Sequence, residues 1–235
     1  MRDETRIPGL RRCLPQVLVR VSGNPSLEAH PLMPEIAKTA EAFPSNVSYR
    51  DLYAFRPIRD EQGTRDRPYE MTVEYDVPAI DALLARFGAK PWVEDRPRLV
   101  IFLAVHHIGN EYVLSSTIDA GDLQREAFQD AAWRYGLEVV IPAERMLQQA
   151  GLDVASLPQA PLSTLQSLLD ASVGQRPLAG TLNWSRELLG WTSTWRLDHQ
   201  GTEHRWGADG GNFDAAFRLA VGGAAQILSG NGTPD

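Results

Sequence analysis

The chain has 235 residues and a mass of 26.0 kDa, enough for one large domain or two small ones with a proper core. Its 23 lysines and arginines against 30 aspartates and glutamates give a net charge of −7, which argues against a basic nucleic-acid groove as its main surface. A single cysteine, Cys13, excludes an internal disulfide framework and a multi-cysteine zinc site. The longest apolar run, Leu99 to Val105, is far short of the roughly 20 residues of a membrane-spanning helix.

The first third of the chain predicts two helices followed by a β-hairpin. Apolar residues recur at helical spacing in the first helix, and Gly23 with Pro25 ends it, because proline cannot continue a helix. Apolar and polar residues alternate strictly in the second strand, which pairs with the first across a polar loop from Arg59 to Arg67. The expected elements are helices over Leu10 to Ser22 and Pro34 to Ala42, and strands over Tyr49 to Ile58 and Tyr69 to Asp76.

The middle of the chain predicts a strand–helix–strand crossover. Leu99 to Val105 and Leu137 to Ile141 are apolar on both faces, which is typical of strands covered by helices. Between them, Asp119 caps and Gly136 ends a helix with apolar residues at helical spacing. We therefore expect the two strands to be neighbouring or near-neighbouring central strands. The flanking elements are a helix between Asp76 and Gly88 and a strand over Tyr112 to Ser115.

The last third predicts a three-strand meander that leads into a final helix capped by Asn212. Ser163 and Gln166 have the spacing of a capping box for a helix that precedes the meander. Together the elements predict an α/β or α+β fold, in which helices pack on a mixed β-sheet that ends in the meander and helix. The meander strands are Leu178 to Trp184, Trp191 to Leu197 and Glu203 to Trp206.

The pattern of elements also predicts the domain organisation. We expect a flexible N-terminus over residues 1–9, a single domain over 10–228 and a disordered polar tail over 229–235. The alternative divides the domain into two subdomains, 10–142 and 161–228, because the stretch between them reads as a connector.

His106 and His107 are the strongest candidates for chemistry, because they follow a buried strand at the point where open α/β sheets often form sites. Adjacent residues of a strand point to opposite faces, however, and no metal-binding histidine spacing is present. Cys13 lies beside Arg11 and Arg12, a setting that could lower its pKa, but no catalytic partner is recognisable. The sequence therefore predicts no catalytic, cofactor-binding or metal-binding residues, and no cofactor.

Tryptophan is concentrated in the meander. Each indole buries a large area, so we expect most of the four to belong to the core. A binding surface is the alternative, because aromatic residues are enriched where proteins meet partners. We expect Trp184 and Trp191 to be cross-strand partners and Trp195 to pack under the final helix. The fourth residue is Trp206.

Several stretches in a fixed order are similar to the bacterial DUF2066 family, whose function is not established. They are Val17 to Pro25, Tyr69 to Asp76, Gly88 to Trp92, Arg96 to Val105, Ala132 to Pro142, Leu178 to Leu182 and Trp191 to Leu197. The resemblance runs over roughly Leu10 to Leu228 and implies a periplasmic protein of the cell envelope. More remotely, the closing meander and helix resemble the amino-terminal domain of TolB-type proteins.

The expected function is a non-enzymatic cell-envelope protein that binds or helps to assemble other envelope components, with a protein partner and no nucleic acid. The first alternative is an enzyme, a hydrolase, with a pocket near His106 and His107. The second is a cytoplasmic binding module, since the residues after Met1 lack the apolar stretch of a secretory leader.

Overall fold

The computed structural model describes residues 3–52, 69–117 and 120–234. The chain divides into two compact units, of which the first holds Met1–Leu18 and Ser26–Pro91 and the second holds Val19–Pro25 and Trp92–Asp235. The expected polar loop Arg59 to Arg67 and the expected cap Asp119 lie outside the described residues.

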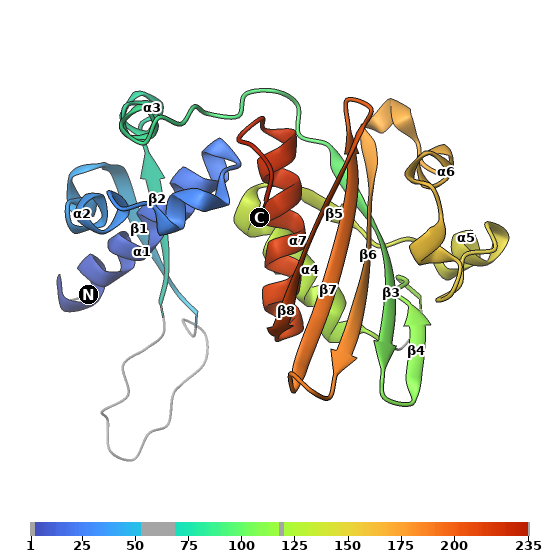
Figure 1. The fold of residues 1–235 in the computed structure, drawn as a ribbon. Coiled ribbons are helices and arrows are strands. Elements are labelled where there is room, and N and C mark those ends of the chain that lie inside the picture. The colour runs from blue at the N-terminus through green and yellow to red at the C-terminus, as the bar shows by residue number, and fades with distance from the viewer. Residues whose placement is uncertain (1–2, 53–68, 118–119, 235) are drawn as a thin grey trace, which may run out of the picture. The chain divides into compact units, whose positions relative to one another are not determined.

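The first unit pairs a long helix with a two-stranded antiparallel sheet (Figure 1). The expected alternation over Tyr69 to Asp76 is confirmed by β2, which pairs with β1 so that Val47 faces Val73 and Tyr49 faces Met71. Its elements are α1 (Asp3–Ser22), η1 (Pro25–Ala29), α2 (Met33–Lys38), η2 (Ala40–Ala42), β1 (Pro44–Asp51), β2 (Tyr69–Tyr75) and α3 (Val77–Arg86). The last turn of α1 belongs to the second unit.

Helix α1 begins at Asp3, well before the expected start at Leu10, so most of the segment 1–9 that we expected to be flexible is helical. The helix approaches the hairpin closely at Gly9, because a Cβ added there would lie 2.6 Å from Met71 Cε on β2. Pro8 and Pro15 lie inside this helix.

The second unit is built on a six-stranded mixed sheet with the order β4–β3–β6–β7–β8, in which β5 also pairs with β3. Strand β3 is parallel to β5 and β6, and the other pairs are antiparallel. The expected α+β fold with a C-terminal meander and helix is thereby confirmed. The strands are β3 (Arg98–His107), β4 (Asn110–Val113), β5 (Glu138–Val140), β6 (Gln175–Ser185), β7 (Gly190–His199) and β8 (Thr202–Gly211).

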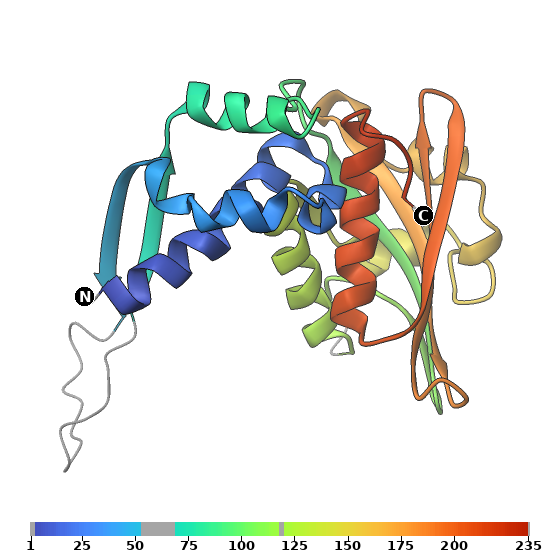
Figure 2. The same cartoon turned by 60° about the vertical axis from the view of Figure 1, so that its left-hand side comes forward.

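Two long helices, α4 (Asp122–Tyr135) and α7 (Phe213–Leu228), cover one face of this sheet (Figure 2). Phe128 from α4 and Phe217 from α7 stack 3.9 Å apart between ring centroids, and both meet Trp195 from β7 edge to face. This aromatic trio is the centre of the core on the helical face.

Short elements cover the β3–β6 part of the opposite face. They are α5 (Glu144–Gln149), η3 (Leu157–Gln159), α6 (Leu162–Ser167) and η4 (Ala171–Val173). Leu147, Leu157 and Leu165 from these elements join a buried cluster with Phe102 and Ala179. The stretch that we read as a connector between subdomains 10–142 and 161–228 is thus part of the second unit's own core.

The expectation for the two apolar strands is half right. Strand β3 is central and its residues Leu99 to Val105 are all buried, and β5 is its parallel neighbour. Strand β5 is not central, however, because within the described chain it pairs with β3 alone. Strands β5 and β4 lie along the same edge of β3. Strand β5 pairs with the first residues of β3, and β4 pairs with its last residues. Helix α4 buries Val139, which explains its apolar character without a second strand neighbour.

Arg96 ties two helix ends together within the second unit. Its guanidinium donates to the carbonyls of Arg20 (2.8 Å) and Val21 (3.2 Å) at the end of α1, and to those of Tyr135 (2.9 Å) and Gly136 (3.3 Å) at the end of α4. The last carbonyls of a helix have no partner inside it, so one side chain here satisfies four of them.

The residues after α7 form hydrogen bonds with α7 and with the end of α1. Asn231 Nδ2 donates to Ser22 O at 2.9 Å, and Gln226 Nε2 donates to Thr233 O at 3.4 Å. The tail over 229–235, which we expected to be disordered, is therefore bonded to the end of α1 and to α7 as far as Thr233.

Candidate functional site

Three strands of the second unit end at the same edge of the sheet. Strands β3 and β6 are parallel, and β8 runs the same way because β7 reverses between them. Helices α4 and α7 begin at this edge, as the lower ends of the ribbons in Figure 1 show. Ligands of open α/β sheets bind outside the carboxyl ends of the strands, so this edge is the first place to look for a site.

A row of three aromatic rings lies at this edge, on the face that α4 and α7 cover. We call His107, Trp184 and Trp191 the aromatic edge. His107 stacks on Trp191 with 5.2 Å between centroids, and it meets Trp184 edge to face at 5.7 Å. Trp184 and Trp191 are cross-strand partners whose centroids are 5.4 Å apart, as expected from the hairpin. The two indoles are only half-buried, so the edge presents aromatic surface to solvent.

A cavity of about 300 Å³ adjoins the aromatic edge, and most of its lining is apolar. Three of its polar side chains have partners: Asp122 pairs with Arg125, and Gln124 bonds the Tyr112 hydroxyl. Burial raises the pKa of Tyr112 above its usual value, although Arg125 and Gln124 act in the opposite direction. The lining residues are His107, Asn110, Tyr112, Ala120, Gly121, Asp122, Leu123, Gln124, Trp191 and Phe213.

The turns beside the aromatic edge carry exposed apolar side chains. Ile108 is 54% exposed in the β3–β4 turn, and Leu188 and Leu189 are 48% and 80% exposed in the β6–β7 turn. Leu189 also has a φ of +47°, a left-handed conformation that costs a leucine energy. We call Ile108, Leu188 and Leu189 the apolar tips. Because β3 and β6 are parallel neighbours, the two turns follow neighbouring strands at the edge of the sheet that carries the aromatic edge.

The two candidate histidines point in different directions, as the sequence predicts. His107 joins the aromatic edge, whereas His106 Nδ1 lies 3.2 Å from Glu111 Oε1 on the neighbouring strand. Within residues 3–52, 69–117 and 120–234, no group of three or more histidine, cysteine or acidic side chains could hold a metal ion. The edge therefore brings together aromatic and aliphatic surface, and only one of the two histidines.

The four tryptophans of the meander divide into two pairs. Trp195 and Trp206 belong to the core, where Trp195 Nε1 donates to Ser193 Oγ at 3.2 Å and Trp206 Nε1 donates to Leu219 O at 3.1 Å. Packing of Trp195 under α7 is thus confirmed. Trp184 and Trp191 form the half-exposed pair at the aromatic edge, so two of the four tryptophans belong to the core, where we expected most of them.

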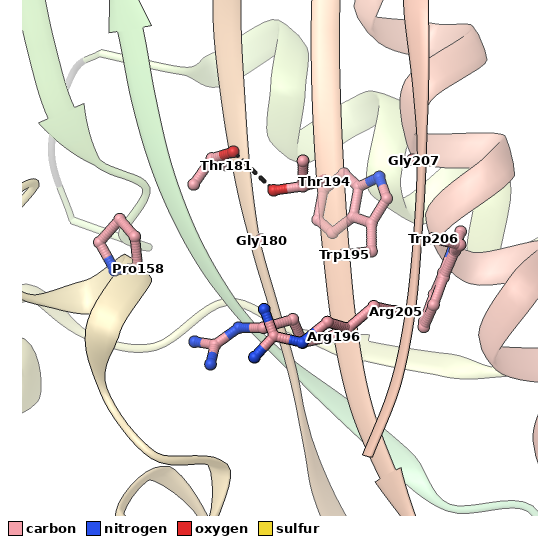
Figure 3. Close-up of a pocket in the computed structure, with 9 residues that line it drawn as sticks. All are labelled: Pro158, Gly180, Thr181, Thr194, Trp195, Arg196, Arg205, Trp206 and Gly207. Carbon is pink, nitrogen blue, oxygen red and sulfur yellow. Dashed lines mark hydrogen bonds between the residues drawn. The ribbon is translucent and has the colours of Figure 1, made fainter.

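A second cavity, of about 340 Å³, lies on the opposite face of the meander (Figure 3). Thr181 and Thr194 share a hydrogen bond of 2.8 Å across its floor. Arg196 donates to Ala160 O at 3.1 Å, and burial lowers the pKa of its guanidinium. Because Arg196 holds η3 and the residue that follows it against the sheet, its role here is structural. The lining residues are Pro158, Gly180, Thr181, Thr194, Trp195, Arg196, Arg205, Trp206 and Gly207.

Two further candidates from the sequence have structural roles. Burial raises the pKa of the Cys13 thiol, and nearby Arg12 offsets this only in part, so the thiol is not activated. Asn212 Oδ1 accepts the amide of Ala215 at 2.8 Å, which confirms it as the cap of α7.

Sequence reasoning missed the apolar tips, Tyr112 and Phe213. A signal for the tips was present, because turns between strands are normally polar and these two carry isoleucine and leucine. Tyr112 and Phe213 could not be assigned to the edge without the sheet order, since they come from β4 and α7.

Comparisons with known proteins find a match for the first part of the chain only. Residues 2–93 match a family described as a domain of unknown function, DUF8605. No curated protein and no solved structure matches the chain. The DUF2066 and TolB-type resemblances are not among the findings. The match ends ahead of β3, so it does not describe the aromatic edge. No helix among the described residues combines the length and apolarity needed to cross a bilayer.

Proposed function

We propose that the chain is a non-enzymatic binding protein that engages a partner through the aromatic edge and the apolar tips. The observation that carries the proposal is the exposure of Ile108, Leu188 and Leu189 beside two half-buried tryptophans. Exposed apolar surface of this kind marks interaction sites, and tryptophan is among the residues that dominate binding energy.

The adjoining cavity supports binding over catalysis. A catalytic pocket needs polar groups that converge on a reacting atom. Here Asp122 is engaged by Arg125 and Gln124 by Tyr112, and the mostly apolar lining, to which His107 and Asn110 also contribute, suits an aliphatic or aromatic side chain of a partner. The alternative of a hydrolase would require the pocket to direct a nucleophile and a base at one point, and His107 instead stacks on Trp191.

Replacement of an apolar tip by serine tests whether this surface is available. We expect Leu189→Ser and Ile108→Ser each to reduce the fluorescence of the apolar dye anilinonaphthalene sulfonate bound to the folded protein, because each removes exposed apolar surface. Neither should lower the midpoint of thermal unfolding appreciably, since more than half of each residue's surface is exposed to solvent. The measurement is a dye titration alongside a thermal scan.

Val173→Ser is the matched control for the dye titration, because Val173 is 47% exposed and precedes β6, at the other end of the sheet. Equal dye fluorescence from all three variants and the unaltered protein would show that the apolar tips do not form a binding surface.

We further propose that the partner is a component of the cell envelope, a placement supported by the resemblance noted in the sequence. The test is a fusion of the natural gene, including the DNA upstream of the Met1 codon, to a reporter that is active only outside the cytoplasm. We expect an active reporter. A reporter silent from every upstream start would favour a cytoplasmic binding module with the same binding surface.

A further inference from the structure

The outer edge of β8 is an unpaired strand edge. Within the described chain, β8 pairs with β7 alone. The two strands are joined by the two-residue turn Gln200–Gly201, whose φ angles are +53° and +79°. In such a hairpin the residues that flank the turn, here His199 and Thr202, exchange both backbone hydrogen bonds.

Alternation along the strand then fixes which backbone groups face outward. Thr202, His204 and Trp206 bond to β7, so the N–H and C=O groups of Glu203 and Arg205 point away from the sheet. No hydrogen bond between elements or from a side chain engages these outward groups in the described part of the chain, and both residues are exposed.

Between Thr202 and Gly207 this edge lacks the usual protection against pairing, and the β-bulge of β8 lies beyond it, between Ala208 and Gly211. Natural edge strands carry lysine or proline or a covering segment to keep other strands away. Strand β8 has neither residue between Thr202 and Gly211, and its one positive side chain, Arg205, is balanced by Glu203 at 2.5 Å. The edge is therefore open to another strand and carries no net charge at Glu203 and Arg205.

Glu203 and Arg205 make the edge complementary to itself. In an antiparallel pair of two β8 strands centred on His204, each Glu203 stands directly opposite Arg205 of the other copy, and four backbone hydrogen bonds form between these residues. The two neighbouring registers, centred on Glu203 and on Arg205, would place Glu203 opposite Glu203 or Arg205 opposite Arg205 and bring like charges together. Charge thus selects one register.

We propose that β8 pairs with β8 of a second copy of this chain, antiparallel and centred on His204, to form a sheet that continues through both copies. This dimer is independent of the proposed function, because the aromatic edge lies at the carboxyl ends of the strands and the pairing uses the side of β8. The ion pair within each strand is exchanged for two ion pairs between the copies, so no charge is left without a partner.

Charge reversal with rescue tests the dimer in the full chain. We expect sedimentation equilibrium to show a reversible monomer–dimer equilibrium for the unaltered protein. In Arg205→Glu, the new glutamate faces Glu203 of the other copy at both symmetry-related positions. The repulsion should raise the dimer dissociation constant about tenfold or more. Glu203→Arg alone should do the same with two arginines.

The double variant Glu203→Arg/Arg205→Glu restores opposite charges across the pair and should return the dissociation constant to within about threefold of the original. A chain that is monomeric at all accessible concentrations would overturn the proposal. A dimer that is unaffected by Arg205→Glu, or one that the double variant fails to restore, would also overturn it. Circular dichroism of each variant separates loss of pairing from loss of folding.

Discussion

Replacement of Trp195 by alanine is expected to lower the free energy of unfolding by about 3–5 kcal/mol, the usual cost of emptying a buried aromatic site. Trp195 is fully buried, and its ring meets Phe128 and Phe217 edge to face with centroids 6.0 and 6.1 Å away. The variant also removes the indole N–H that bonds Ser193, a further buried polar group. Chemical denaturation monitored by circular dichroism measures the change.

Trp133→Ala is the matched control for this experiment. Trp133 is 66% exposed, and its ring lies 5.2 Å from the Arg20 guanidinium, an interaction worth about 0.5–1 kcal/mol at an exposed site. Equal losses of stability from the two variants would show that Trp195 does not anchor the core, and would move the binding surface towards the middle of the meander.

Replacement of Arg96 by glutamine is expected to cost about 2–4 kcal/mol of stability. The guanidinium satisfies four carbonyls at the ends of α1 and α4, and it stacks 4.5 Å from the centroid of Trp92. Hydrogen bonds from a charged group contribute roughly 1.5–3 kcal/mol each when buried, and partial exposure of this site reduces the total. Burial, together with Arg20, lowers the pKa of Arg96, which reflects how far the group is withdrawn from water.

Arg96→Lys should recover less than half of this loss, because an ammonium group cannot reach both helix ends in the planar arrangement that a guanidinium provides. Arg176→Gln serves as the control, since Arg176 is exposed on β6. A denaturation midpoint for Arg96→Gln equal to that of the control would mean that water satisfies the helix carbonyls equally well.

Local patterns in the sequence predict local structure well. Alternation of apolar and polar residues predicted β2 and the meander, and helical spacing of apolar residues predicted α4 and α7. Each pattern reflects the burial of one face of one element. The expected pairing of Trp184 with Trp191 also follows from a short hairpin and needs no distant information.

Features that depend on distant partners could not be predicted. Ser163 and Gln166 have capping-box spacing, yet α6 begins after Pro161 and Gln166 instead donates to Gln175 O. Arg96 reads as one arginine among many, and its role depends on two helix ends that lie far away in the sequence. Strand β5 looks central because α4 covers it, a contact that the apolar pattern cannot distinguish from a neighbouring strand.

The candidate site was half predictable. His107 and the tryptophan pair could be named, but the pattern could not show that β6 lies beside β3 and so brings the three rings into one row. The grouping of the apolar tips depends on the same sheet order. Each alone is a single exposed residue, and only adjacent turns make them a surface.

Site-specific photo-crosslinking in the native host tests the binding surface most directly. A benzoylphenylalanine introduced at Leu189, or in a separate variant at Ile108, should form a discrete adduct with another molecule on irradiation. The same group at Val173, which is exposed at the other end of the sheet, should form none. Adducts of equal yield from all three positions, or no adduct from Leu189 and Ile108, would contradict a partner at the aromatic edge.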